Sequence, residues 1–134
     1  MTDQLTLDDA EQLRQLLARF SHAFDNADAE ALGTVFAPDG VIELARTGAV
    51  FEGLEAIRAF SRDLAPEHPD HQTVDITFRR DEDGVVRGRS RYLVLLADGA
   101  VHNGEYLDVY TRTPEGWRIA RRRSVPRYPL ARVH

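Results

Sequence analysis

The sequence contains no cysteine. Disulfides, thiolate metal ligands and cysteine nucleophiles are therefore excluded. No apolar stretch approaches the roughly 20 residues that cross a bilayer. The first residues carry neither the basic region nor the apolar run of a secretory signal. We therefore expect a cytoplasmic protein with no membrane partner.

An excess of positive charge is also missing. Lys and Arg number 17 against 22 Asp and Glu, which gives a formal net charge of −5. Nucleic-acid-binding domains usually present a basic face, so no nucleic-acid partner is expected. The sequence has no glycine-rich phosphate loop and no dinucleotide fingerprint. Its five histidines include no HExxH motif.

The composition that remains is that of a single soluble globular domain. The 134 residues are 43% hydrophobic and 29% charged, which is enough to build a core. We find no internal repeat and no linker. Residues 1–134 are therefore expected to form one domain, with residues 126–134, which carry two prolines, as an extended C-terminal tail.

The first half of the sequence has the pattern of helices. Thr6 and Asp9 resemble a capping box, and apolar residues then recur at helical spacing to about Asn26. A short helix is predicted over 29–36, with Pro38-Asp-Gly40 ending it, a strand over 41–44 and a third helix over 54–64.

The second half has the pattern of strands. They are predicted over 72–80, 85–97, 101–112 and 116–125, separated by glycine-containing turns typical of antiparallel hairpins. Strands this long must curl or carry bulges, because sheets twist. The predicted fold class is α+β: a cone-shaped, mostly antiparallel sheet of four to six strands wrapped by three helices, with an open end suited to a ligand.

Two polar residues in this scheme could do chemistry together. Asp25 ends the first helix and His71 opens the first long strand. A carboxylate that orients an imidazole is the minimal equipment for removing a proton from carbon. The structural alternative is that Asp25 only ends its helix and His71 is a half-exposed strand residue.

Three segments resemble the SnoaL-like, nuclear transport factor 2-like superfamily. They are Phe24-Asp25-x-x-Asp28 with Phe36-Ala-Pro-Asp39-Gly40, Phe51-x-Gly53-x-Glu-Ala-Ile57, and Gly104-x-Tyr106-x-Asp108 with Gly116-Trp117-Arg-Ile119. The resemblance covers nearly the whole chain and implies a cystatin-like α+β barrel. It also implies a homodimer or higher homo-oligomer, formed through the outer face of the sheet.

Within that superfamily, the subgroup similar to scytalone dehydratase pairs an Asp of the first helix with a His of the sheet, and Asp25 and His71 stand at matching places. The resemblance implies a cofactor-independent lyase, a dehydratase-type enzyme, or an isomerase. His71 would be the base and Asp25 its orienting partner. The substrate would be small, largely apolar and cyclic, of polyketide, terpenoid or steroid type.

The sequence also departs from better-known relatives. Phe24 replaces the tyrosine of the scytalone dehydratase pattern, and Phe20 and Leu44 stand where steroid isomerases carry their catalytic groups. These differences argue against a ketosteroid-isomerase mechanism. With Phe60, these three residues are expected to form apolar walls.

Further candidates lie on the long strands. His102, Tyr106 and Asp108 alternate on one strand face and could form a polar cluster against a substrate. Gly104 between them could permit a bulge or close approach of a ligand. Tyr92 is expected in the core or pocket wall. Arg122 could turn inward to bind an anionic or carbonyl group, or all of Arg121–Arg123 could be solvated or pair with acids such as Glu43.

Three alternatives remain from the sequence. Asp25, His71 and His102 could form a three-ligand metal site, but the resemblance implies chemistry without a metal or cofactor. The domain could be a non-catalytic ligand-binding or assembly module. It could also be a SnoaL-type polyketide cyclase, which would use an acidic residue as base without His71.

Overall fold

The computed structural model describes residues 4–128. Its main element is a single curled sheet. Within that range the sheet has six strands in the order β2-β1-β6-β5-β4-β3. The strands are β1 (Phe36–Leu44), β2 (Val50–Glu52), β3 (Asp70–Arg80), β4 (Val86–Leu95), β5 (Val101–Thr113) and β6 (Gly116–Tyr128). β1 and β6 run parallel, and all other neighbours are antiparallel.

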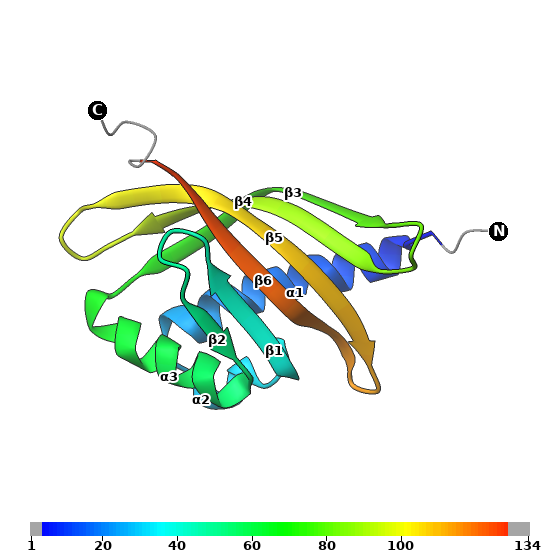
Figure 1. Ribbon diagram of the computed structural model, residues 1–134, viewed down its shortest axis with the longest axis horizontal. Coiled ribbons are helices and arrows are strands. Elements are labelled where there is room, and N and C mark those ends of the chain that lie inside the picture. Colours follow the sequence, from blue (N-terminus) through cyan, green and yellow to red (C-terminus); the bar gives the residue numbers. More distant parts are fainter. Residues whose placement is uncertain (1–3, 129–134) are drawn as a thin grey trace.

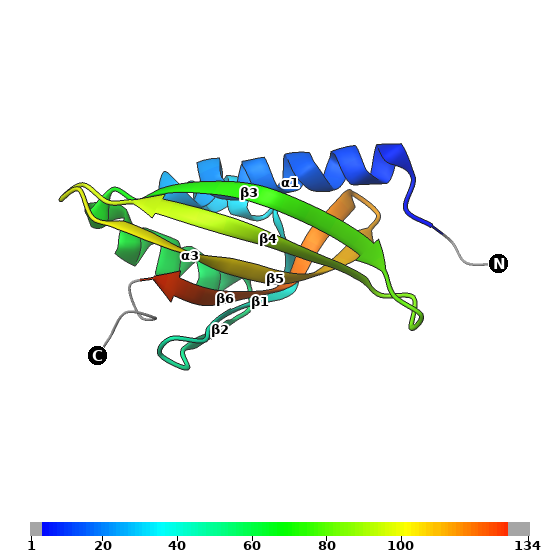
Figure 2. The same ribbon diagram turned by 90° about the horizontal axis from the view of Figure 1, so that it is seen from above.

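The helices are α1 (Leu7–Asp25), α2 (Ala29–Leu32) and α3 (Leu54–Leu64), with a 3₁₀ turn η1 (Ala65–Glu67) before β3. α1 packs on β3 and β6, and α3 packs on β1 and β2. β5 and β6 cross α1 diagonally (Figure 1), and α1 runs alongside β3 when the molecule is seen from above (Figure 2). The predicted α+β fold is therefore confirmed, but β2 and β3 are free edges, so the sheet is curled rather than closed into a barrel.

Bulges produce the predicted curl. The pairing register shifts between Val74 and Thr77 in β3, where Asp75 has a φ of 53°. It shifts twice more between β5 and β6, beginning at Asn103 and Val109. Each bulge bends its strand and increases the local twist. The sheet consequently wraps around a core to which α1 contributes most of its apolar side chains: Leu13, Leu16, Leu17, Phe20, Ala23 and Phe24.

The start of α1 is fastened to the sheet as well as capped. Asp9 N donates to Thr6 Oγ1 and Thr6 N donates to Asp9 Oδ2, which confirms the capping box. Asp9 Oδ1 also accepts from Trp117 Nε1 at 3.2 Å and lies 3.2 Å from Arg112. Burial acts to raise the pKa of Asp9, but the bonds to Thr6 and Trp117 and the charge of Arg112 outweigh it and hold the pKa below its ordinary value.

Replacing Asp9 with alanine is expected to lower the free energy of unfolding at pH 7 by about 2 kcal/mol, because a cap is lost and the indole N–H loses its acceptor. The pKa of Asp9 is lower in the folded than in the unfolded protein, where it is about 3.9. The ionised Asp9 therefore stabilises the fold at pH values above about 3.9, and this contribution is lost as the pH falls through the folded-state pKa. The deficit of Asp9→Ala should therefore shrink in urea titrations at pH 3. Asp8→Ala, an exposed neighbour in the same turn, serves as control, and an equal loss in both variants would contradict the assignment.

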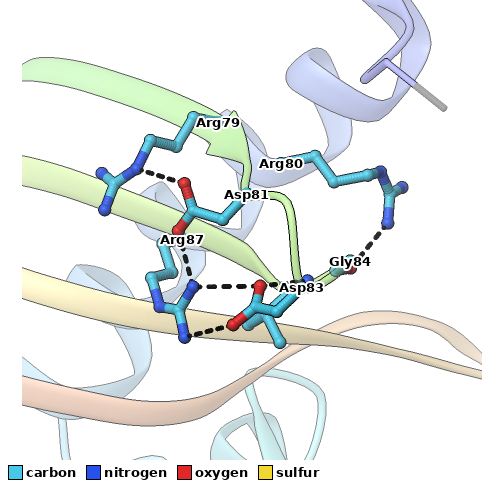
Figure 3. A network of polar contacts seen from close by, with 7 residues as sticks. Arg79, Arg80, Asp81, Asp83, Gly84 and Arg87 are labelled. Atoms are coloured by element: carbon cyan, nitrogen blue, oxygen red, sulfur yellow. Dashed lines mark hydrogen bonds and ion pairs between the residues drawn. The ribbon is translucent and has the colours of Figure 1, made fainter. Parts of the chain in front are cut away.

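The turn between β3 and β4 is held by charge rather than by apolar packing. Asp81 accepts from Arg79 and Arg87, and Arg87 also pairs with Asp83 (Figure 3). Arg80 NH1 donates to the carbonyl of Gly84 at 3.0 Å. These contacts between exposed and half-buried charged side chains hold the hairpin turn together.

Several predicted boundaries were wrong. The second helix ends at Leu32, and Phe36 already belongs to β1, so Pro38-Asp-Gly40 lies within a strand as an irregularity where the β1–β6 register shifts. β2 had no counterpart in the prediction. β6 continues to Tyr128, which takes the start of the expected tail into the sheet, and the rest of the tail lies outside the described residues.

Candidate active site

A cavity of about 320 Å³ opens on the inner face of the sheet, beside α3. A smaller pocket of about 60 Å³ continues it inward toward α1. The two share five lining residues: Leu44, Leu64, His71, Tyr106 and Ser124. We call both together the chamber, and the smaller part its inner end. The size lies toward the lower end of the range of about 300–1,000 Å³ for ligand pockets, which suits a small molecule.

Asp25 and His71 meet in the wall of the chamber. Asp25 Oδ1 lies 2.5 Å from His71 Nδ1, and Asp25 Oδ2 accepts from the backbone N–H of His71 at 2.7 Å. Their side chains are only 10% and 11% exposed. A carboxylate at Nδ1 favours the tautomer with the proton on that nitrogen, which leaves the lone pair on Nε2.

The imidazole is held in place by aromatic rings. Phe20 and Phe24 contact it edge-on, with ring centroids 6.0 and 5.8 Å away. His71 lines both the larger cavity and its inner end. Among the described residues, the hydrogen bond of the His71 ring is the one that Nδ1 makes to Asp25, and Nε2 makes none. The ring is thus oriented on one side and available on the other.

Arg122 supplies a buried cation at the inner end. Its Nε and NH2 donate to the two carboxylate oxygens of Asp108, both at 2.8 Å, and each side chain is 1% exposed. Tyr110 donates a further hydrogen bond to Asp108 at 2.8 Å. Burial acts against the charged guanidinium, but Asp108 outweighs it and the pKa of Arg122 lies above its ordinary value. NH1 of Arg122 has no partner among residues 4–128.

Tyr106 lies beside this cation. The guanidinium carbon of Arg122 sits 3.7 Å from the centroid of the Tyr106 ring and 4.4 Å from that of Phe20. The Tyr106 hydroxyl makes no hydrogen bond within the described range. Burial raises the pKa of Tyr106, so the phenol stays protonated and can donate. The inner end therefore combines a base, Nε2 of His71, with two free donors.

An outer groove of about 450 Å³ lies between α1 and β3, on the other side of the Asp25–His71 pair. Its lining mixes polar and apolar side chains and includes Arg14, Asn26 and Gln72. Asp25 lines this groove but neither part of the chamber. The carboxylate thus lies behind the imidazole as seen from the chamber.

Most of the predicted site residues come together. The chamber is lined by His71, Tyr106, Arg122, Phe20, Phe24, Leu44, Phe60, Tyr92 and His102. Asp108 differs from the expectation, because it lines no part of the chamber and instead holds Arg122. Arg121 and Arg123 pair with Glu43 on the outer face, while Arg122 turns inward. The inward turn of Arg122 and the pairing of Arg121 and Arg123 with Glu43 are thus both observed, whereas the binding of a substrate group by Arg122 stays a prediction.

Gly104 lies where the pairing register of β5 and β6 shifts, so the bulge expected there is present. A Cβ there would lie 2.4 Å from the carbonyl oxygen of Val125 and 2.5 Å from the Tyr92 hydroxyl. Gly88 similarly leaves room for the ring of Tyr110. The close approach is that of tyrosine rings of the protein, not of a ligand.

Sequence reasoning did not find Ser124 and Arg46. Ser124 Oγ donates to the Tyr92 hydroxyl at 3.3 Å, and both line the larger cavity. Strand alternation from Arg122 would have placed Ser124 on the inner face. Arg46 lies in the loop between β1 and β2, where no periodic signal exists.

Two further site types were tested against residues 4–128. No group of three or more His, Asp or Glu side chains there is arranged to hold a metal ion. None of the helices in this range is long and apolar enough to cross a membrane.

The fold and the chamber define a small cone-shaped α+β domain with a buried polar end. Residues 5–123 match the family described as SnoaL-like domain, and the chain belongs to this family. No curated protein matches the sequence.

Solved structures agree with this assignment. A variant of Rv3472, a protein of unknown function from Mycobacterium tuberculosis, is 29% identical with a TM-score of 0.81, over 92% of this chain and 75% of that one. Aln2 from a Streptomyces species is 25% identical with a TM-score of 0.81, over 96% and 98%. An NTF2-like protein with a cystatin-like fold from Novosphingobium aromaticivorans is 28% identical with a TM-score of 0.74, over 92% and 84%.

Proposed function

We propose that the chamber is the active site of a cofactor-independent lyase or isomerase. The substrate is a small, largely apolar, cyclic molecule with a carbonyl group. The observation that carries the proposal is the hydrogen bond of Asp25 to Nδ1 of His71, which leaves Nε2 free in the wall of the chamber. That arrangement suits a general base that acts on carbon.

The first step in this proposal is proton removal. Nε2 of His71 takes a proton from the carbon next to the carbonyl, the C–H electron pair forms a C=C bond to the carbonyl carbon, and the C=O π pair moves to the oxygen. Asp25 stabilises the imidazolium that forms, as carboxylates do in other His-carboxylate pairs. The surrounding Phe20 and Phe24 rings exclude water, which strengthens this interaction.

The developing negative oxygen is held at the inner end. NH1 of Arg122 and the hydroxyl of Tyr106 are the free donors there. Preorganised donors at the place where charge develops commonly supply the largest part of a rate enhancement. Because Asp108 already balances the guanidinium charge, the inner end suits a neutral carbonyl that becomes an enolate.

Two outcomes follow from the same enolate. If the neighbouring carbon carries a leaving group such as hydroxide, the electron pair returns and expels it, and the proton on Nε2 leaves with it as water. If no such group is present, the proton returns to a different carbon and the product is an isomer. The cyclic, largely apolar shape expected of the substrate fits both.

Exchange of a carbon-bound proton tests the proposal without knowledge of the natural substrate. Bicyclic ketones such as 1-tetralone are incubated with the protein in D₂O, and loss of the α-proton signal is followed by NMR. We expect exchange roughly a hundredfold or more above the buffer rate, the usual contribution of a positioned base. Saturable ketone binding with exchange no faster than in buffer would instead favour the ligand-binding module.

The proposal includes a homodimer formed through the outer face of the sheet. Five large apolar side chains on β3, β4 and β5 are between 38% and 55% exposed: Val74, Leu93, Leu95, Val101 and Leu107. An apolar set of this kind on one sheet face supports association.

A further inference from the structure

The open end of the chamber carries a set of polar residues that the proposed chemistry does not use. Arg46, Thr47, Glu67 and His102 line the larger cavity but not its inner end, and we call them the rim. Arg46, Thr47 and Glu67 are exposed and His102 is half-buried. These residues lie on three different segments, so the fold gathers them at one opening.

The loop that carries Arg46 is firmly tied to the sheet. Ala45 N donates to the carbonyl of Ser124 at 3.0 Å, and Gly48 N donates to the carbonyl of Leu44 at 2.8 Å. Gly48 has a φ of 77°, which few other residues adopt without strain. The backbone at Arg46 is therefore anchored beside Ser124, at the edge of the cavity.

Arg46 also differs from the arginines on the outer face. Arg121 and Arg123 both pair with Glu43. Over residues 4–128, Arg46 forms no ion pair, hydrogen bond or ring contact. Its charge nonetheless reaches the chamber wall. Burial raises the pKa of Tyr92, and the hydrogen bond from Ser124 and the positive charge of Arg46 partly offset that rise. A cation without an acidic partner thus stands beside a hydroxyl of the cavity.

We propose that Arg46, together with His102 and the Tyr92 hydroxyl, binds an anionic group, a carboxylate or phenolate, at the outer end of the substrate. This rests on the proposed function in that the chamber is the substrate site. The inner end is not expected to bind an anion, because Asp108 balances the charge of Arg122 there. The substrate class is therefore an elongated ring compound with a neutral carbonyl at one end and an acidic group at the other.

Glu67 is the acidic residue of the rim. It lies in η1, on a different segment from Arg46, and its carbonyl accepts from Ala97 N at 3.2 Å. If its carboxylate governed the opening, cationic ligands would be preferred. Whether the chamber prefers anionic or cationic ligands therefore shows whether Arg46 or Glu67 determines which ligands bind at the rim.

The test compares 2-naphthoate with 2-naphthamide, its neutral analogue of similar size, by isothermal titration calorimetry at low salt. We expect the wild type to bind the anion about tenfold more tightly, which is near the lower end of the range for a hydrogen bond to a charged group. Arg46→Gln should bring the two affinities within about twofold of each other. Arg62→Gln removes an exposed arginine of α3 that does not line the chamber, and it should leave the preference unchanged.

Three results would overturn the inference: equal binding of both probes by the wild type, an unchanged preference in Arg46→Gln, or no saturable binding of either probe. His71→Ala separates this inference from the proposed chemistry. It should abolish proton exchange but keep the preference for the anion. A loss of proton exchange alone therefore tests the proposed role of His71 as base, and a loss of the preference for the anion alone tests the proposed role of Arg46 in binding.

Discussion

Replacing His71 with alanine is expected to lower the rate of α-proton exchange by roughly a hundredfold or more, because no other free base lines the inner end in the described structure. The Michaelis constant should change far less, since the donors that bind the carbonyl remain. His71→Gln, which keeps much of the ring's volume beside Phe20 and Phe24, guards against a packing effect. Far-ultraviolet circular dichroism checks the fold of both variants.

Asp25→Asn is expected to reduce the rate by a similar factor. Both partners of Asp25 are donors, the ring Nδ1–H and the backbone N–H of His71. A carboxylate accepts from both, whereas a carboxamide offers one acceptor oxygen and turns its NH₂ toward the other donor. The imidazole would then change tautomer or orientation. Asp70→Asn, an exposed carboxylate next to His71, is the matched control and should leave the rate unchanged.

The pattern across these variants separates the candidate functions. Loss of activity in both supports the base and its orienting partner. Loss in Asp25→Asn with full activity in His71→Ala would refute the proposal and point to a cyclase-type mechanism with an acidic base. Full activity in both would place the chemistry elsewhere.

Replacing Asp108 with alanine is expected to lower the free energy of unfolding by about 3–5 kcal/mol, since it leaves the guanidinium of Arg122 buried without its counter-charge. At this chain length a loss of that size lowers the melting temperature by roughly 10 °C or more. Differential scanning calorimetry measures it directly. Glu105 lies on the same strand as Asp108, and Glu105→Ala, which breaks the more exposed pair with Arg89 of β4, should cost less than about 1 kcal/mol.

A double variant separates stability from function. Arg122→Met combined with Asp108→Leu removes both buried charges and should recover much of the stability lost in Asp108→Ala. Exchange should nevertheless remain about tenfold or more below the wild type, because NH1 of Arg122 is gone as a donor. A double variant with wild-type exchange would show that the pair serves the fold alone.

Local patterns in the sequence were sufficient for α1, α3 and the long strands, since each shows the periodicity of its own geometry. They predicted the strand over 41–44 but missed the first half of β1, because Pro38-Asp-Gly40 has the composition of a turn. There the strand continues through an irregularity because its neighbours, β2 and β6, supply pairing that no local pattern encodes.

The site could be predicted less directly. Asp25 and His71 lie 46 positions apart, so no local pattern shows that they meet, and the prediction depended on their chemistry and on the family resemblance. The inward turn of Arg122 stayed open because neither face of its strand is wholly apolar. The antiparallel register that places Arg122 opposite Asp108 decides it, and that register depends on bulges that the sequence does not reveal.

β3 is an edge strand of the sheet. On the edge of β3 that has no neighbouring strand, the backbone N–H of His71 donates to Asp25 Oδ2. Exposed strand edges invite pairing with other chains, and proteins cover them with charge or with a helix. Here one carboxylate at the end of α1 supplies both. A substitution at Asp25 that disables the imidazole therefore also uncovers a site for strand addition, so inactive variants at this position should be more prone to aggregate than inactive variants at His71.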